Sequence, residues 1–153
     1  MKKIVVLSDT HGNYSALEKL LPIMQESDYV FHLGDYQKDI LSYQKELGNK
    51  IISVKGNCDG GGNDQLLEIE GVKIFLTHGD RYSVKSDLFR LEYKAKEVRA
   101  SLVFYGHTHC AGVYESDSIT YVNPGCLNGF LERSYCYAVI HDGKFVLKNV
   151  KVR

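Results

Sequence analysis

The chain has 153 residues, of which 44% are hydrophobic, 25% charged and 11% aromatic. This composition is typical of a soluble globular protein and excludes an intrinsically disordered chain, and the length predicts a single domain over residues 1–153. The 19 basic side chains balance the 19 acidic ones, so the net charge gives no strong signal for nucleic-acid binding. No hydrophobic run approaches the length of about 18 residues that a membrane helix needs.

The N-terminus and the cysteines together predict a cytoplasmic protein. Lys2 and Lys3 precede a hydrophobic run of only four residues, which is too short for the core of a signal peptide. The cysteines contain no C-x-x-C pair and therefore resemble neither a zinc ribbon nor a redox motif. Without a signal peptide they are expected to be reduced thiols. They are Cys58, Cys110, Cys126 and Cys136.

Strand-like and helical patterns alternate in the first two thirds of the chain. Runs rich in β-branched and aromatic residues predict strands at 4–7, 29–33, 51–54, 72–76 and 102–105. Leucines at helical spacing predict a helix over 14–25 with Asn13 as its N-cap. Weaker patterns predict helices over 37–48, ending at Gly48, and over 86–99, capped by Ser86.

The last third of the chain changes character. Strands are predicted at 111–115, 119–122, 136–140 and 144–150, with no helix between them, and Asp142-Gly143 indicates a hairpin turn. A β-α-β-α-β beginning followed by antiparallel strands predicts two sheets packed face to face with helices outside. This is an α/β sandwich.

Metal-binding side chains follow each of the first five predicted strands. In open α/β sheets, ligands bind just beyond the carboxyl ends of the strands. Asp9 and His11 are two residues apart, as are His107 and His109, so in extended backbone each pair points to one side. The full set of candidates is Asp9, His11, Asp35, Asn57, His78, His107 and His109.

These residue types point to a two-metal site. Aspartate, histidine and asparagine together suit first-row divalent cations, and seven ligands fit two ions that share a carboxylate better than one ion. Two divalent ions and two aspartates leave a charge of about +2, which favours an anionic substrate and lowers the pKa of a bound water. Such sites hydrolyse phosphoesters.

The order of these motifs resembles the calcineurin-like metallophosphoesterase superfamily, and in particular its small one-domain phosphodiesterase branch in bacteria and archaea. That branch also includes the non-catalytic scaffold subunit of the retromer coat. A possible N-P-G turn at Asn123-Pro124-Gly125 extends the similarity over most of the chain. The motifs are Asp9-Thr10-His11, Gly34-Asp35, Gly56-Asn57-Cys58-Asp59, His78-Gly79 and Gly106-His107-Thr108-His109.

The resemblance implies a four-layer αββα sandwich and an assignment of the ligands. Asp9, His11 and His109 would hold the first ion, Asn57, His78 and His107 the second, and Asp35 would bridge both. The expected catalytic residues are Asp35, Asn57, His78 and His107. A hydroxide between the ions would attack phosphorus in line. Mn²⁺ is the favoured ion, with Ni²⁺, Co²⁺, iron and Zn²⁺ as alternatives.

Two positions depart from the family pattern. Many members have histidine after the motif asparagine, where it can protonate the leaving group, but here that residue is Cys58. A thiol is a poorer acid, which favours diesters with good leaving groups over alkyl monoesters. We expect Cys58 to be a packing residue, with an acid or a redox-sensitive thiol as alternatives. Asp80 replaces a common histidine, and orienting His78 or Arg81 is the role considered for it.

Residues near these motifs have simpler interpretations. His32 is expected to be a core or supporting histidine, and His141 a structural or surface one. The glycines at 60–62 predict a turn, since they lack the lysine of a P-loop. Asn123 is expected to support the site. Tyr36 is a candidate for stacking on an aromatic leaving group, and for Arg81 a phosphate contact and a solvated loop position are both open.

The sequence therefore predicts a metal-dependent phosphoesterase, most readily a phosphodiesterase acting on small substrates in an open cleft. The alternatives are a non-catalytic scaffold on the same fold, a phosphomonoesterase or nucleotide phosphatase, and a nuclease. All seven ligands are retained, which speaks against a scaffold. Self-association is expected only from analogy at the level of the fold.

Overall fold

The computed structural model describes residues 1–129 and 132–153. Within these ranges, ten strands form two mixed five-stranded sheets. The first sheet has the order β10 (Lys144–Lys151), β9 (Ser134–His141), β1 (Lys2–Leu7), β2 (Tyr29–His32) and β3 (Ile51–Ser53). The second has the order β4 (Gln65–Ile69), β5 (Val72–Leu76), β6 (Leu102–Phe104), β8 (Ile119–Asn123) and β7 (Gly112–Ser116).

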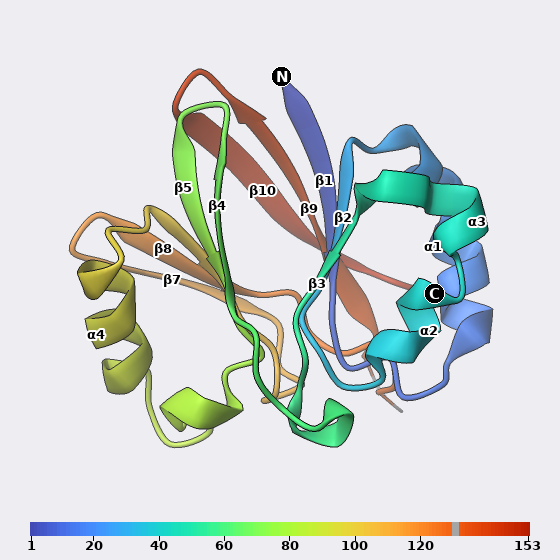
Figure 1. Ribbon diagram of the computed structural model, residues 1–153, viewed down its shortest axis with the longest axis horizontal. Helices are drawn as coiled ribbons and strands as arrows, with labels where there is room; N and C mark the ends of the chain where they lie inside the picture. Colours follow the sequence, from blue (N-terminus) through green and yellow to red (C-terminus); the bar gives the residue numbers. More distant parts are fainter. Residues whose placement is uncertain (130–131) are drawn as a thin grey trace.

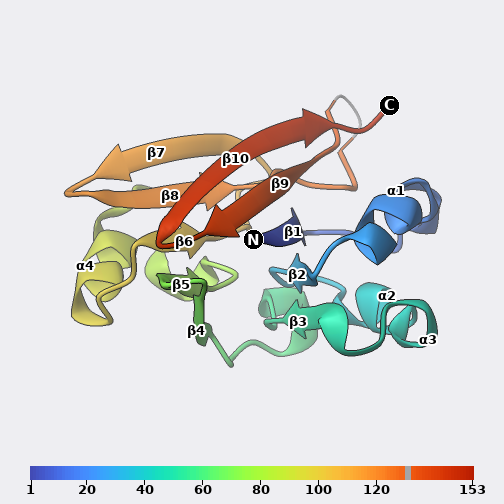
Figure 2. The ribbon, with the colours of Figure 1, turned by 90° about the horizontal axis from the view of Figure 1, so that it is seen from above.

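Helices cover the two outer faces of this pair of sheets (Figure 1 and Figure 2). One group lies against the first sheet, and one helix lies against the second. The first group is α1 (Tyr14–Glu26), α2 (Gln37–Leu41) and α3 (Gln44–Leu47), and the second is α4 (Phe89–Glu97). Short 3₁₀ helices occur at Gly48–Lys50, Asn57–Asp59 and Asp80–Tyr82. The predicted four-layer αββα sandwich is thereby confirmed.

The strand β1 shows how the layers are built. Ile4 and Val6 face the core between the two sheets, whereas Val5 and Leu7 face α1, and all four are fully buried. Successive side chains of a strand point to opposite faces, so a strand covered on both sides is hydrophobic at every position. This explains the uninterrupted apolar run that the sequence shows here.

The pairing of the strands brings the functional loops to one edge. In the first sheet β1, β2 and β3 are parallel, and in the second β5, β6 and β8 are parallel. The loops after β1 and β2 are joined by a hydrogen bond from Asp9 N to Gly34 O of 3.0 Å, and those after β5 and β6 by one from Gly106 N to His78 O of 2.9 Å. The amide of His107 then reaches Asp9 Oδ2 across the sheets, at 3.2 Å.

The predicted helix over 37–48 is interrupted and forms α2 and α3. At the break, the hydroxyl of Ser42 donates to the backbone carbonyl of Asp39, at 2.6 Å. Serine hydroxyls that bond nearby backbone groups compete with helix continuation in this way. The phenol of Tyr43 is held by Glu18 of α1, at 2.8 Å, which fixes the turn between the two short helices.

Two further expectations are corrected. The helix predicted over 86–99 begins only at Phe89, because Asp87 rather than Ser86 accepts a hydrogen bond from the amide of Phe89, at 3.0 Å. The strand β4 was not predicted, and β8 lies parallel to β6 rather than in a purely antiparallel array. The Asn13 cap is confirmed by a hydrogen bond from Ala16 N to its side chain, at 3.2 Å.

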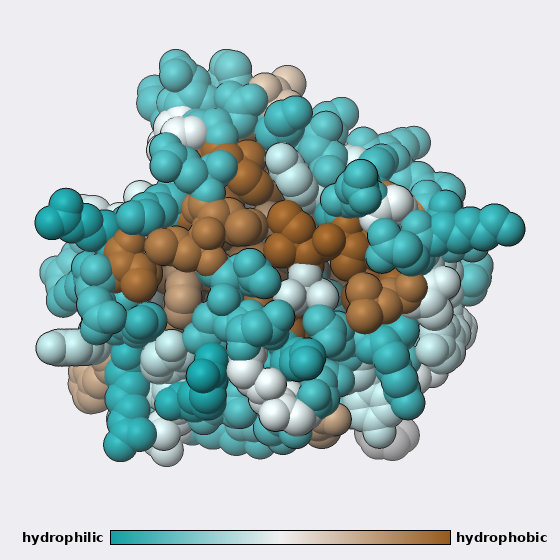
Figure 3. All heavy atoms as spheres, viewed as in Figure 1, coloured by the Kyte–Doolittle hydropathy of each residue, from teal (hydrophilic) through white to brown (hydrophobic). Residues whose placement is uncertain are grey.

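The face seen in Figure 1 carries a band of hydrophobic residues across its middle, over β4 and β3 (Figure 3). Leu66 is 44% exposed there, and Ile52 and Leu67 are half-buried. Among the described residues, no helix is both long and apolar enough to cross a membrane. Self-association through this or any other face stays a prediction.

Candidate metal centre

The backbone of the candidate site is unusual. Five of the seven candidate ligands have positive φ angles: Asp9 54°, His11 44°, Asp35 61°, His107 69° and His109 63°. This left-handed conformation is uncommon for residues other than glycine and costs about 1–3 kcal/mol each. Such strain clusters at functional sites, where the surrounding structure enforces it. Here the sharp turns directly after β1, β2 and β6 enforce it.

Two glycines allow the site loops to approach closely. A Cβ atom on Gly106 would lie 2.8 Å from Asp9 Oδ2 and would also overlap the hydroxyl of Ser8. A Cβ atom on Gly56 would lie 2.5 Å from the amide nitrogen of Asp35 and would overlap its carboxylate. Only glycine therefore lets these loops pack against the two aspartates.

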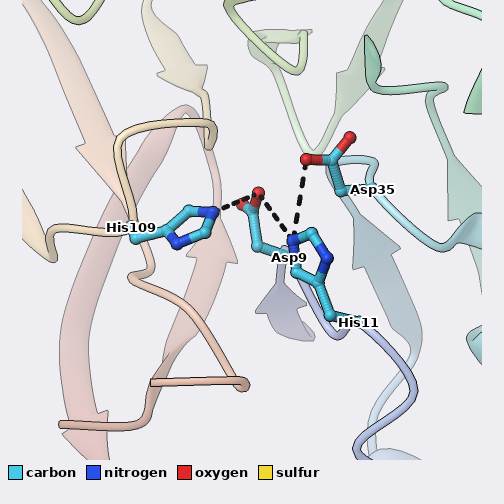
Figure 4. Close-up of side chains that lie close together, drawn as sticks. All are labelled: Asp9, His11, Asp35 and His109. Carbon is cyan, nitrogen blue, oxygen red and sulfur yellow. Dashed lines mark ion pairs between the residues drawn. The ribbon is translucent and has the colours of Figure 1, made fainter. Parts of the chain in front are cut away.

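The first group of donor atoms comes from the loops after β1, β2 and β6 (Figure 4). Asp9 Oδ1 lies 3.1 Å from His109 Nε2 and 3.9 Å from His11 Nε2. Asp35 Oδ2 lies 3.7 Å from the same nitrogen of His11. These four side chains each offer one atom, and all the atoms lie within 4.8 Å of one another. That spacing is suited to a single cation at their centre.

The second group shares Asp35 with the first. His78 Nε2 lies 3.4 Å from Asp35 Oδ2, 3.2 Å from His107 Nδ1 and 3.0 Å from Asn57 Oδ1. Asp35, His78 and His107 again offer atoms within 4.8 Å of one another, and the amide oxygen of Asn57 adds a fourth donor. The structure therefore brings all seven predicted residues into two adjacent groups with Asp35 common to both. Their roles as ligands stay a prediction.

Two of the donor atoms have no hydrogen-bond partner in the protein and are therefore suited to a cation. Asp9 Oδ1 and His11 Nε2 are buried and make no hydrogen bond within the described residues. His78 Nδ1 lies 2.7 Å from the carbonyl oxygen of Leu33, which can only accept, so this nitrogen carries the proton. In neutral His78, Nε2 then directs a lone pair at the oxygens of Asp35 and Asn57. A shared cation removes that repulsion and accounts for the arrangement.

Electrostatics supports an ionised Asp35 in this site. Burial by itself would raise the pKa of Asp35, but the neighbouring His78 and the hydrogen bond from the Cys58 backbone amide lower it far below its ordinary value. Burial and the neighbouring His78 lower the pKa of His107, whereas the contact with Asp9 raises the pKa of His109. Asp35 is therefore a carboxylate, the form that binds a cation, at neutral pH.

Supporting side chains hold these loops. Asn123 is fully buried and donates to Gly106 O at 3.1 Å and to Thr108 Oγ1 at 2.9 Å. It supports the loop of His107 and His109, as predicted. Asp59 was quoted only as part of a motif. Its carboxylate accepts from Gly56 N at 2.9 Å and from Gln37 N at 3.0 Å, and it thus ties the loop carrying Asn57 to the start of α2.

The histidines outside the site are placed as expected. His32 is fully buried and accepts a hydrogen bond from Gly34 N at Nδ1, 3.1 Å away, which makes it a satisfied core histidine. Burial lowers its pKa to about 4. The side chain of His141 is 68% exposed. Both predictions are confirmed.

Two expectations near the site, those for Cys58 and Asp80, are corrected, and the alternatives for Arg81 are decided. Cys58 is exposed rather than packed, and its backbone amide donates to Asp35 Oδ1 at 2.9 Å. The side chain of Arg81 is 52% exposed and its guanidinium pairs with Asp64 at 3.0 Å, which agrees with the solvated loop position. His78 is oriented by Leu33 rather than by Asp80.

Comparison with known proteins gives a family. The model of the calcineurin-like phosphoesterase superfamily domain matches residues 1–143. A curated phosphodiesterase of Methanocaldococcus jannaschii is 30% identical over 149 residues, which cover 84% of this chain and 86% of that protein.

Solved structures agree in fold. A protein of Streptococcus pneumoniae described as a predicted phosphoesterase superposes with a TM-score of 0.80 at 30% identity, covering 98% of this chain and 89% of that one. A single-mutant form of Vps29 from Entamoeba histolytica superposes with a TM-score of 0.79 and covers 99% of both chains. At 20% identity, the second similarity concerns the fold alone.

Proposed function

The chain belongs to the calcineurin-like phosphoesterase superfamily, and on that premise we propose that it hydrolyses small phosphodiesters with two divalent cations. The observation that carries the proposal is the position of Asp35. Its carboxylate is common to two groups of donor atoms, each within a span of 4.8 Å. Two cations so close together need a bridging anion, and a shared carboxylate supplies it.

The residues divide naturally between the two cations. Asp9, His11 and His109 would hold one, Asn57, His78 and His107 would hold the other, and Asp35 would contact both. When bound, two divalent cations lower the pKa of a water between them and offset negative charge on the phosphate. Mn²⁺ suits this mixed oxygen and nitrogen donor set, with Ni²⁺, Co²⁺, iron and Zn²⁺ as the other ions to test.

The chain itself supplies charge balance and rigidity. Only two of the seven ligands are anionic, so the loaded site attracts an anion such as a phosphodiester. Leu33 O fixes the ring of His78 at 2.7 Å, and the amide of Cys58 fixes one oxygen of Asp35 at 2.9 Å. Donor atoms that are already held need little reorganisation during the reaction.

The side chain beside Asn57 favours diesters over alkyl monoesters. Burial and the nearby Asp35 carboxylate raise the pKa of the Cys58 thiol, so it is a weak acid at neutral pH. A poor leaving group needs a proton in the transition state, and Cys58 is badly suited to give it. Diesters whose leaving groups are stable as anions do not need this proton.

The test compares hydrolysis of bis-p-nitrophenyl phosphate and p-nitrophenyl phosphate by protein stripped of metal and then supplied with each cation in turn. We expect cation-dependent turnover with a preference for the diester, and its loss in Asp35→Asn. Asp117→Asn is the matched control, because Asp117 lies in the exposed turn between β7 and β8 and forms a surface ion pair with Lys96. A monoester preference would overturn the substrate class while keeping the metal centre.

A second candidate function is that of a non-catalytic scaffold, and the similarity to the Vps29 fold is the observation that favours it. Folded protein that binds cations but hydrolyses no ester with any of them would support this alternative. The proposal also includes a cytoplasmic location, which the four free cysteines support.

A further inference from the structure

A cavity of about 440 Å³ lies beside the candidate metal centre. One wall is the start of α2, whose N-cap directly follows Asp35 in the chain. The other wall is the 3₁₀ helix Asn57–Asp59, which begins at a candidate ligand. The volume is in the range of small-molecule sites. The lining residues are Tyr36, Gln37, Lys38, Leu41, Cys58 and Asp59.

Tyr36 occupies a position where the backbone disfavours it. Its φ is +65°, and its side chain makes no capping hydrogen bond although it is the N-cap of α2. Glycine or asparagine adopts this conformation more easily, and a bulky residue there is an outlier. The ring is only half-buried, so the core does not require it either. Strain of this kind beside an active site points to a role in function.

The Tyr36 ring contacts His11 of the candidate metal centre and Lys38 of the cavity wall. Its centroid lies 4.9 Å from that of His11, at an interplanar angle of 50°, and the ammonium of Lys38 lies 5.4 Å from the ring centroid. Within the described residues, Lys38 forms no ion pair. The ring and this cation together present a surface that attracts another π-system.

Two polar side chains of the cavity wall, Asp59 and Gln37, are already engaged in hydrogen bonds. Both oxygens of Asp59 accept backbone hydrogen bonds, from Gln37 and from Gly56, and the side-chain amide of Gln37 donates to Ser53 Oγ at 2.6 Å. These bonds make the wall rigid. The phenol ring of Tyr36, Leu41 and the polarisable Cys58 sulfur remain as contact surface.

We infer that this cavity binds a planar aromatic ring carried by one ester arm of the substrate phosphate, with Tyr36 as the specificity-determining residue. The inference rests on the proposed function, since the phosphate is held at the metal centre. An aryl group and a nucleobase share the required chemistry. An ester arm of a phosphate at the metal centre can reach Tyr36, because the Tyr36 ring lies 4.9 Å from the ring of the candidate ligand His11 and also lines the cavity.

The experiment measures binding of non-hydrolysable phosphonates to Mn²⁺-loaded protein by calorimetry and by competitive inhibition. Phenylphosphonate and methylphosphonate have the same anionic head, so their affinity ratio isolates the ring. We expect phenylphosphonate to bind about 10-fold tighter, as an aromatic contact provides. A nucleoside 5′-phosphonate forms a third arm: tighter binding than phenylphosphonate identifies a nucleotide ester, and weaker binding a simple aryl ester.

The decisive variant is Tyr36→Asn, because asparagine suits the left-handed backbone. We expect its thermal midpoint to equal or exceed that of the wild type while the phenyl-to-methyl affinity ratio falls to about 1, since the aromatic contact is gone. Tyr93→Asn is the matched control, because Tyr93 is an exposed residue of α4, and it should keep the wild-type ratio.

Different results would overturn the aromatic site and the proposed phosphodiesterase function. Equal binding of the two phosphonates by the wild type, or an unchanged ratio in Tyr36→Asn, would overturn the aromatic site even if diesters are hydrolysed. Absence of both phosphonate binding and ester hydrolysis would instead overturn the proposed function.

Discussion

The hydroxyl of Thr10 joins two buried residues behind the metal centre: it lies 2.7 Å from Asp39 Oδ2 and 3.1 Å from His32 Nε2. A carboxylate only accepts, so Thr10 donates its proton to Asp39 and accepts from His32. His32 Nδ1 in turn accepts from Gly34 N. One chain of hydrogen bonds thus links the loop of Asp9 and His11 to the loop of Asp35.

Replacing Thr10 should weaken metal binding through this chain. Thr10→Val removes the hydroxyl, so the side chains of Asp39 and His32 each lose a hydrogen-bond partner. We therefore expect a loss of about 1–3 kcal/mol in unfolding free energy. We also expect a loss of about 10–100-fold in Mn²⁺ affinity, as for other groups that orient ligands. Calorimetric titration of metal-free protein measures this. Thr10→Ser keeps the hydroxyl and should restore the affinity; failure to do so would contradict the chain.

The buried His32 should make stability depend on pH. Its pKa is lowered to about 4 in the fold, against about 6.5 in an unfolded chain. The unfolded state therefore binds a proton first, and stability present above pH 6.5 is lost as the pH falls towards 4, by about 3 kcal/mol in total. Urea unfolding across this range should show a steeper loss for the wild type than for His32→Gln, which cannot titrate. Parallel curves would refute the prediction.

Gly106→Ala tests the close approach to Asp9. The added Cβ would lie 2.8 Å from Asp9 Oδ2 and must displace it, so we expect diester hydrolysis to fall at least about 10-fold while the protein still folds. The measurement is kcat/KM together with the thermal midpoint. Gly112→Ala is the control, because a Cβ there meets nothing within 4 Å. Equal activity of the two variants would show that the approach is not needed.

Cys58→His should extend activity to poorer leaving groups. An imidazole titrates near neutral pH, and general acid catalysis contributes about 10²-fold or more. We expect the ratio of kcat/KM for diphenyl phosphate to that for bis-p-nitrophenyl phosphate to rise, since only phenol needs protonation as it leaves. Cys58→Ser, which supplies no such acid, should leave the ratio as it is. A rise in both variants would point to relief of crowding instead.

The candidate site could be predicted from the sequence because it depends on local order along the chain. Each buried strand ends in a turn that presents Asp, His or Asn, and strand composition marks where those turns fall. His32 was assigned to the core for the same reason, since it lies inside a hydrophobic run. The exposed side chain of Cys58 was missed because sequence does not show which way a residue of a short 3₁₀ helix points.

Long-range contacts explain the other differences. The segment 37–48 has only a weak helical pattern. It is interrupted where the Ser42 hydroxyl bonds the carbonyl of Asp39, and the long-range contact of Tyr43 with Glu18 of α1 fixes the break. The strand β4 has half-exposed residues and becomes a strand by pairing with β5. The hairpin β9–β10 pairs with β1 on the edge opposite β2 and β3. The local sequence of the hairpin does not specify this pairing.

The sequence by itself determined every strand except β4, the seven candidate ligands and their placement after strand ends, because hydrophobic periodicity and turn chemistry are local properties. The family resemblance implied that Asp35 is shared by both groups, and only the tertiary structure decided that Thr10 links His32 to Asp39 and that Tyr36 borders a cavity. These are distances between segments far apart in the chain, and they are set when the two sheets pack and bring their loops to a common edge.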